Sequence, residues 1–130
     1  MKQVLLTKAL RAKLLENYKT PDANHKPVVK FFTPWGAATW LITDMDDTGR
    51  MFGLCDLGQG YPELGYVSLE ELQSLRGPVG LRVERDVHFG TSLGLEEIAE
   101  LSRDAGEIVT ERPGPQDLFS QASANLEDIL

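Results

Sequence analysis

The chain of 130 residues has 42% hydrophobic and 25% charged residues. This composition is typical of one globular domain and excludes collagenous, low-complexity and fully disordered proteins. Its apolar runs are too short for a membrane span or a secretory signal. The single cysteine, Cys55, excludes an intrachain disulfide and a multi-cysteine zinc site. We therefore expect a cytoplasmic protein without membrane contact.

The net charge of −7 is distributed unevenly along the chain. Residues 1–30 carry seven basic and two acidic side chains, whereas residues 31–130 carry six basic and 18 acidic ones. A basic arm on an acidic body can contact nucleic acid. The arm can equally lie on the acidic body or in solvent, and this is favoured because it lacks the interleaved aromatic side chains of nucleic-acid readers.

Four apolar side chains recur at four-residue spacing near the N-terminus: Leu6, Leu10, Leu14 and Tyr18. The spacing predicts a helix over residues 7–18, with Thr7 as its N-cap. Residues 20–27 are rich in turn formers and contain two prolines, which predicts an exposed connection. His25, in this connection, is expected to face solvent.

From residue 28 the apolar period changes to two, which predicts antiparallel strands that follow one another as a meander. The polar residues 44–49 form a turn between two of the strands. They do not form a calcium loop, because the twelfth position is Cys55 and not a glutamate. The expected strands cover residues 28–33, 36–43, 50–57, 64–67 and 81–89, with a last short strand over 107–110.

Two further helices are expected. Ser68 and Glu71 have the spacing of a capping box, which starts a helix over residues 69–76. The second covers about residues 93–105, with Thr91 or Ser92 as its cap and Gly106 as its left-handed end.

The order of elements places the helices on one side of the sheet and gives the α+β class. We expect a single domain with an antiparallel meander sheet of about five strands, an N-terminal helix and two further helices packed on it. The domain covers residues 1–111. A Pro/Gly break and an acidic C-terminal tail follow over residues 112–130.

Asp56 interrupts an apolar face of the strand over residues 50–57, where it alternates with Phe52 and Leu54. A carboxylate in such a position needs a partner, because an unpaired buried charge is costly. Capping the amides of the glycine loop that follows is the structural solution. A catalytic or ligand-binding carboxylate is the alternative.

The strand over residues 81–89 places Glu84, Asp86 and His88 on one face. Two carboxylates and an imidazole at this spacing can hold a divalent cation or act as an acid–base set. A solvated face gives the same pattern and is favoured, so these three residues are only weak metal-site candidates. Arg85 points inward and is expected to pair with Asp56 or Glu63.

The glycine loop after Asp56 resembles a phosphate cradle only superficially, because neither a lysine nor a helix N-terminus follows it. Trp35 and Trp40 are expected to pack in the core or against a turn. The candidates for contact with a ligand or partner are Arg85, Gly58, Gly60, Tyr61 and Trp35.

Three blocks resemble, in order, a bacterial family catalogued as domain of unknown function 2958: residues 32–41 (FTPWGAATWL), 52–72 (FGLCDLGQGYPELGYVSLEEL) and 84–89 (ERDVHF). The likeness covers roughly residues 5–103. It implies a short protein of a plasmid or other mobile element. No activity is assigned to the family, so the resemblance implies no catalytic residue.

Two functions remain open. The first is a non-enzymatic binding or accessory module of a mobile element, acting on a host or element protein, for instance as an acidic counter-defence factor that mimics nucleic-acid charge. The second is a small metal-dependent hydrolase or nuclease that uses Asp56, Glu63, Asp86 and His88. Binding without a cofactor is favoured, because the sequence shows no recognisable nucleophile–base pair.

Overall fold

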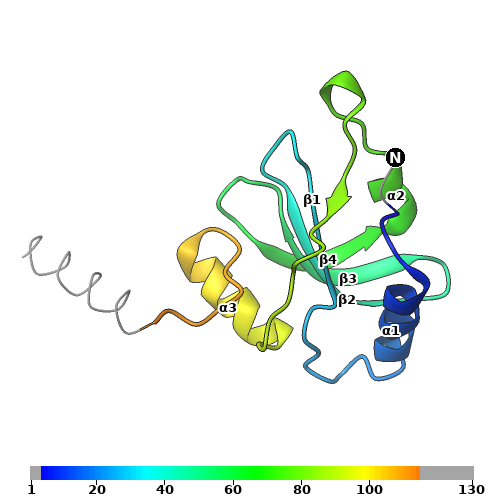
Figure 1. The fold of residues 1–130 in the computed structure, drawn as a ribbon. Helices are drawn as coiled ribbons and strands as arrows, with labels where there is room; N and C mark the ends of the chain where they lie inside the picture. Colours follow the sequence, from blue (N-terminus) through cyan, green and yellow to red (C-terminus); the bar gives the residue numbers. More distant parts are fainter. Residues whose placement is uncertain (1–3, 115–130) are drawn as a thin grey trace, which may run out of the picture.

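The computed structural model describes residues 4–114. This part of the chain has an α+β fold with three α-helices and five β-strands, as the sequence predicts (Figure 1). The acidic tail lies outside the described residues from position 115 on. The helices are α1 (Lys8–Tyr18), α2 (Leu69–Ser74) and α3 (Leu95–Ala105), and the strands are β1 (Val29–Phe32), β2 (Thr39–Met45), β3 (Arg50–Asp56), β4 (Glu63–Ser68) and β5 (Glu84–Arg85).

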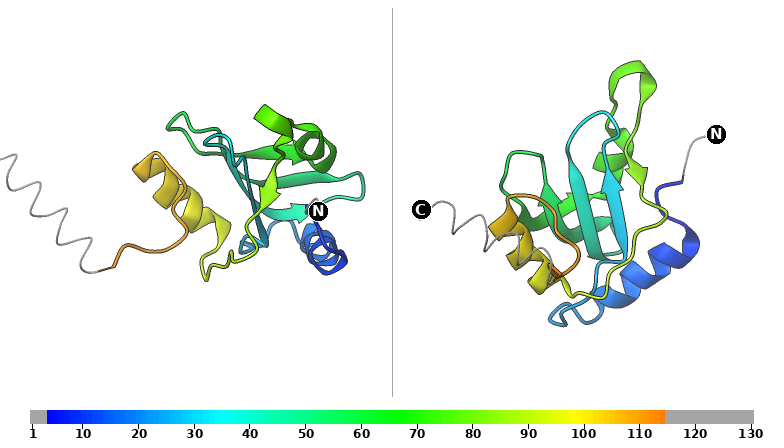
Figure 2. Two further views of the ribbon diagram at one scale, coloured as in Figure 1. Left: turned by 45° about the horizontal axis from the view of Figure 1, so that its top comes forward. Right: turned by 60° about the vertical axis from the view of Figure 1, so that its left-hand side comes forward.

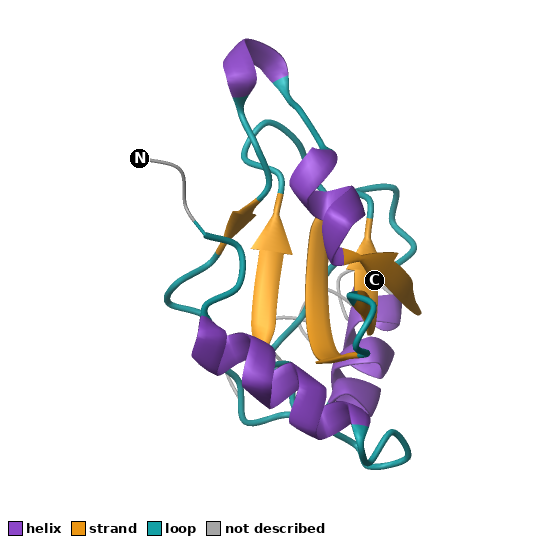
Figure 3. Ribbon diagram, turned by 90° about the vertical axis from the view of Figure 1, so that its right-hand side faces the viewer, coloured by secondary structure: helices purple, strands orange, loops and turns teal. Residues whose placement is uncertain are grey.

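The strands form one open antiparallel sheet in the order β4-β3-β2-β1-β5. Strands β1 to β4 are neighbours in chain order, which confirms the meander, and β5 pairs with the other side of β1. Between α2 and β5 the chain makes an excursion that projects beyond the sheet, with a short 3₁₀ turn at Pro78–Gly80 (Figure 3). The two edges of the sheet are therefore β4 and β5.

Helices cover both faces of the sheet (Figure 2). We call the face of the sheet that packs against α1 and α2 the α1 face. The buried residues of this core layer, from the sheet and the two helices, include Leu14, Phe31, Trp40, Ile42, Met51 and Leu72. The opposite face, called the α3 face, buries Leu41, Leu54, Leu93, Leu95, Ile98 and Ala99.

The expectation that all helices lie on one side of the sheet is wrong. Leu41 and Ile42 are adjacent in β2 and point to opposite faces, and both are fully buried. A central strand that is apolar on both faces needs a cover on each of them. Helix α3 supplies the second cover, as the apolar side of its sequence requires.

The ends of the helices follow the predicted chemistry in three of four cases. Thr7 Oγ1 accepts a hydrogen bond from Leu10 N, and Ser68 Oγ accepts one from Glu71 N. Gly106 ends α3 with a left-handed φ of 74°. The start of α3 differs, because its N-cap residue is Gly94 and a side chain from another loop, Asn24 Oδ1, accepts the hydrogen bond from Glu96 N at 3.1 Å.

The strand expected over residues 81–89 is reduced to β5, and residues 107–110 form no strand. Asp86 ends β5, because its Oδ1 accepts a hydrogen bond from His88 N at 3.0 Å and its carbonyl accepts one from Phe89 N. This side-chain turn competes with strand pairing. Val87, which a regular strand over residues 81–89 would place on the inward face with Arg85, is exposed as a result.

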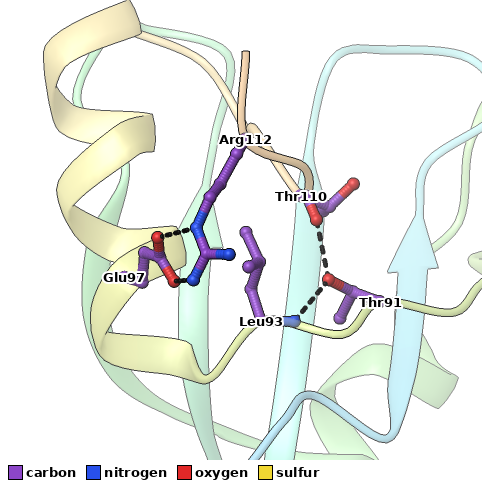
Figure 4. A network of polar contacts seen from close by, with 5 residues as sticks. All are labelled: Thr91, Leu93, Glu97, Thr110 and Arg112. Carbon is purple, nitrogen blue, oxygen red and sulfur yellow. Dashed lines mark hydrogen bonds and ion pairs between the residues drawn. The ribbon is translucent and has the colours of Figure 1, made fainter. Parts of the chain in front are cut away.

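The segment after α3 folds back along the helix and is fixed by polar contacts (Figure 4). Arg112 binds both carboxylate oxygens of Glu97, with Nη2 to Oε2 at 2.8 Å. Thr91 Oγ1 donates to the Thr110 carbonyl at 2.7 Å and accepts from Leu93 N. The Arg112 guanidinium lowers the pKa of the Glu97 carboxyl below its ordinary value through this hydrogen bond.

Candidate functional site

The residues expected to form an acid–base or metal set do not come together. Asp56 lies opposite Thr39, Thr39 opposite Phe32, and Phe32 opposite Glu84. Two strands therefore separate Asp56 from Glu84, which corresponds to about 14 Å at the usual strand spacing. Glu63 is farther away still, on β4. Within residues 4–114, no three His, Cys, Asp or Glu side chains form a group that could hold a metal ion.

Asp56 has a structural role. Its side chain is 6% exposed, and Oδ1 accepts a hydrogen bond from Gly58 N at 2.8 Å. The sequence suggested that Asp56 caps an amide of the glycine loop, and this hydrogen bond is that cap. Gly58 and Gly60 both have positive φ values, of 81° and 86°, so they form a tight turn that presents Tyr61 to solvent.

The predicted polar face of the last strand borders a shallow groove of about 610 Å³. Glu84 and Asp86 line it together with Lys30, whose Nζ lies 3.9 Å from Asp86 Oδ2. His88 does not line the groove and is exposed. Asp86, one of the candidate metal ligands, therefore already lies beside the positive charge of Lys30.

Arg85 fixes the N-terminal segment to the sheet. Its Nη1 donates hydrogen bonds to the carbonyl oxygens of Val4 at 2.8 Å and Leu5 at 2.7 Å. The expected ion pair with Asp56 or Glu63 is wrong, because β1 and β2 lie between β5 and the strands that carry those carboxylates. Arg85 does point to the α1 face, since it lies opposite Phe31.

Replacing Arg85 with alanine is expected to lower the free energy of unfolding by about 2 kcal/mol, a typical value for hydrogen bonds made by a charged group. The loss also frees the segment that buries Leu5 and Leu6. Chemical denaturation measures the change. Arg85→Lys is the matched control and should recover only part of the stability, because an ammonium lacks the guanidinium fork. Unchanged stability of the alanine variant would contradict this role.

Both tryptophans pack inside the fold, as expected. Trp40 is buried on the α1 face. Trp35 is half-buried and its ring lies against Gly77, where an added Cβ would approach Trp35 Cδ2 to 2.3 Å. Trp35 therefore fixes the root of the excursion between α2 and β5. Val79, at the tip of this excursion, is almost wholly exposed and has a φ of 50°.

Strand β4 is an open edge with apolar side chains. Within the described chain, it pairs with β3 alone. Its exposed side chains on the α3 face include Leu64 and Tyr66, and Tyr66 packs against the Phe52 ring and below the Arg50 guanidinium. Leu57 and Tyr61, in the loop that leads into β4, are also exposed.

A cavity that the sequence did not reveal lies beside this edge. It has a volume of about 300 Å³ and is bounded by residues 21–25, the α3 face of the sheet and the start of α3. Its polar lining includes His25, Asp44 and Glu96, and its apolar lining includes Phe52 and Leu64. We call it the Asp44 cavity.

Asp44 lies in β2 and not in a solvated turn, because a bulge between Ile42 and Asp44 shifts the register and buries both Thr43 and Asp44. Burial raises the pKa of the Asp44 carboxyl, and the Thr43 hydroxyl and the nearby His25 imidazole partly oppose this rise. The contribution of Asp44 to stability is therefore lost as the pH rises through the raised pKa.

His25 is half-buried and hydrogen-bonded, although it was expected to face solvent. Its Nε2 lies 2.8 Å from the Thr20 carbonyl oxygen, and its own carbonyl accepts a hydrogen bond from Leu95 N. The connection over residues 20–27 thus reaches the start of α3. No sequence signal marks this contact, since it joins a turn to a helix about seventy positions later.

The described residues contain no helix that is long and apolar enough to cross a membrane. A family model described as "Protein of unknown function (DUF2958)" matches residues 5–109. The match includes every helix and strand of the described fold and the residues around the Asp44 cavity. No curated protein and no solved structure is significantly similar to the chain.

Proposed function

The chain belongs to the DUF2958 family of proteins of unknown function, and we propose that it is a non-enzymatic module that binds a partner protein by adding an extended segment of that partner to β4. The module acts in the cytoplasm, and the mobile-element association implied by the resemblance makes a host or element protein the partner. The open β4 edge carries this proposal.

The two edges of the sheet differ in a way that supports it. An unpaired strand is a template for another strand, and proteins usually protect such edges by making them short or charged. β5 is two residues long, Glu84 and Arg85, and fits this description. β4 has six residues, and Tyr66 on it is 62% exposed. Strand addition at such an edge is a common mode of peptide recognition.

The charge near β4 defines the partner segment. Helix α3 contacts β4 and exposes three carboxylates at four-residue spacing, Glu96, Glu100 and Asp104. This spacing puts the three carboxylates on one side of the helix. Arg103 is the one basic residue of α3. We therefore infer a partner segment that alternates apolar and basic residues. An acidic counter-defence factor that mimics nucleic-acid charge would also bind basic residues of its partner.

The hydrolase or nuclease alternative gains no support from the geometry, because Asp56 caps a loop and lies far from Asp86. Cys55 is half-buried and its burial raises the pKa of the thiol, which disfavours a thiolate nucleophile. The basic N-terminal segment, which exposes Lys8, Arg11 and Lys13 on α1, is the part we assign to any nucleic-acid contact.

Peptides selected from a display library of random extended sequences test the proposal. Selected peptides are expected to alternate apolar and basic residues and to slow amide hydrogen exchange over residues 63–68. Tyr66→Lys should weaken their binding at least tenfold, because it removes the aromatic contact and repels basic residues. Val87→Lys is the matched control, since Val87 is 61% exposed and Tyr66 is 62% exposed. Equal binding by the two variants would contradict strand addition at β4.

A further inference from the structure

The Asp44 carboxylate is mostly buried and has one hydrogen-bond donor within the described part of the chain. Its side chain is 8% exposed, and Oδ2 accepts a hydrogen bond from Thr43 Oγ1 at 3.2 Å. Within residues 4–114, Oδ1 accepts no hydrogen bond but is open to solvent, because no fully buried side-chain oxygen in this range lacks a partner; the Asp44 residue lines the cavity. A carboxylate that is mostly removed from water and has a single hydrogen-bond donor is stabilised by a further donor or a counter-charge. The cavity therefore favours a group that brings donors and positive charge.

The other groups around the cavity point to the same chemistry. Asp22 and Glu96 add two carboxylates from the loop and from α3, and none of the described residues that line the cavity is a lysine or arginine. The positive end of α3 does not favour an anion here, because Leu95 N and Glu96 N already donate to the His25 carbonyl and to Asn24 Oδ1. An anion would meet three carboxylates, whereas a cation would be stabilised by them.

Among the described residues of the lining, the imidazole of His25 is the remaining titratable group. Its Nε2 is engaged with the Thr20 carbonyl oxygen at 2.8 Å. The opposite wall is apolar, with Phe52, Leu64 and Leu95. A volume of about 300 Å³ is at the small end of ligand sites, which suits a charged head on a short hydrocarbon stem.

We propose that the Asp44 cavity is a binding site for an organic cation, an ammonium or guanidinium group on a short apolar stem. The charged head binds Asp44, with Glu96 beside it, and the stem packs on Phe52 and Leu64. The cavity binds a charged group, whereas the β4 edge binds the backbone of an extended segment, so the cation proposal holds whether or not a strand is added at β4. Leu64 belongs to both, so a basic side chain of a strand added at β4 is one source of the cation, and a free small molecule is the other.

The test is a titration of the full chain with butylammonium and butylguanidinium, followed by NMR of the backbone amides and of the Asp44 carboxyl carbon. Both cations should give saturable shifts at residues that line the cavity and should raise the melting temperature. Butanol and butyrate, which match the stem in size but are neutral or negative, should give neither. Absence of saturable cation binding, or equal binding of butyrate, overturns the proposal.

Asp44→Asn should weaken cation binding at least tenfold while the fold is kept, which the amide spectrum checks. Because this variant removes a buried charge, we expect it to be no less stable than the parent protein. Asp47→Asn is the control, since Asp47 is an exposed carboxylate in the turn after β2 and does not line the cavity. If the two variants bind the cations equally, the proposal is wrong.

A competition arm distinguishes the two sources of the cation. If a basic side chain of the partner fills the cavity, butylammonium will displace β4-binding peptides, and replacing their lysine with norleucine will weaken them. If a free small molecule fills it, peptide and cation will bind together. The β4 proposal fails if Tyr66→Lys does not change peptide binding. That result would not affect the cation titration, which tests the Asp44 cavity alone.

Discussion

Replacing Gly53 with alanine is expected to lower the free energy of unfolding by about 4 kcal/mol or more, which is a large part of the stability of a small domain. A Cβ at this position would lie 1.8 Å from the Leu41 carbonyl oxygen and 2.9 Å from Ile42 Cα. Both contacts are with the backbone of β2, so no side chain can move to relieve them. Circular dichroism during chemical denaturation measures the loss.

Gly65→Ala is the control for this change. Gly65 lies directly opposite Gly53 in the neighbouring strand, and an added Cβ there meets nothing within 4 Å. We expect its stability to stay within about 0.5 kcal/mol of the parent protein. Similar losses in the two variants would mean that the sheet is sensitive to any side chain in this row, and not to the close approach of β2 and β3.

Phe31→Ala is expected to be the second most destabilising change, at about 3–5 kcal/mol, because it leaves a large cavity in the core. The Phe31 side chain is 0% exposed and lies on the α1 face between Trp40 and Arg85, its neighbours across β2 and β5. Thermal and chemical unfolding both report the change.

Phe32→Ala is the matched control, because Phe32 is the next residue of β1 and points to the opposite face, into the open groove. It is only half-buried, so its truncation removes fewer contacts and should cost about 1–2 kcal/mol. A larger loss for Phe32 than for Phe31 would reverse the assignment of the two faces.

The elements that local sequence determines could be predicted well. The four-residue apolar spacing and Thr7 located α1 to within a residue, and Ser68 with Glu71 located the start of α2. The alternating apolar pattern located β1 to β4, since each of these strands pairs with the one before it in the chain. Such contacts depend on neighbouring residues, which a sequence pattern records.

The elements that depend on distant contacts could not be predicted. Arg85 binds the carbonyls of residues about eighty positions away. The short length of β5 has a local cause, the turn between the Asp86 side chain and His88 N, which the alternating apolar pattern does not record. The bulge in β2 places Asp44 in a cavity, although the residues after it form a turn, as expected. No sequence period marks a bulge, so this site remained hidden while the proposed metal residues, chosen by alternation alone, fell on separate strands.

The contact of the loop over residues 20–27 with the first turn of α3 also sets an order of assembly. Asn24 and His25 supply acceptors for two amides at the start of a helix that begins at Leu95. The β1–β4 meander is built from near neighbours in the chain, and contacts of this kind form fastest during folding. Because the loop leads directly into this sheet, we expect α3 to obtain its cap after the sheet has formed. We therefore expect the second face of the sheet to close after the meander has formed during refolding.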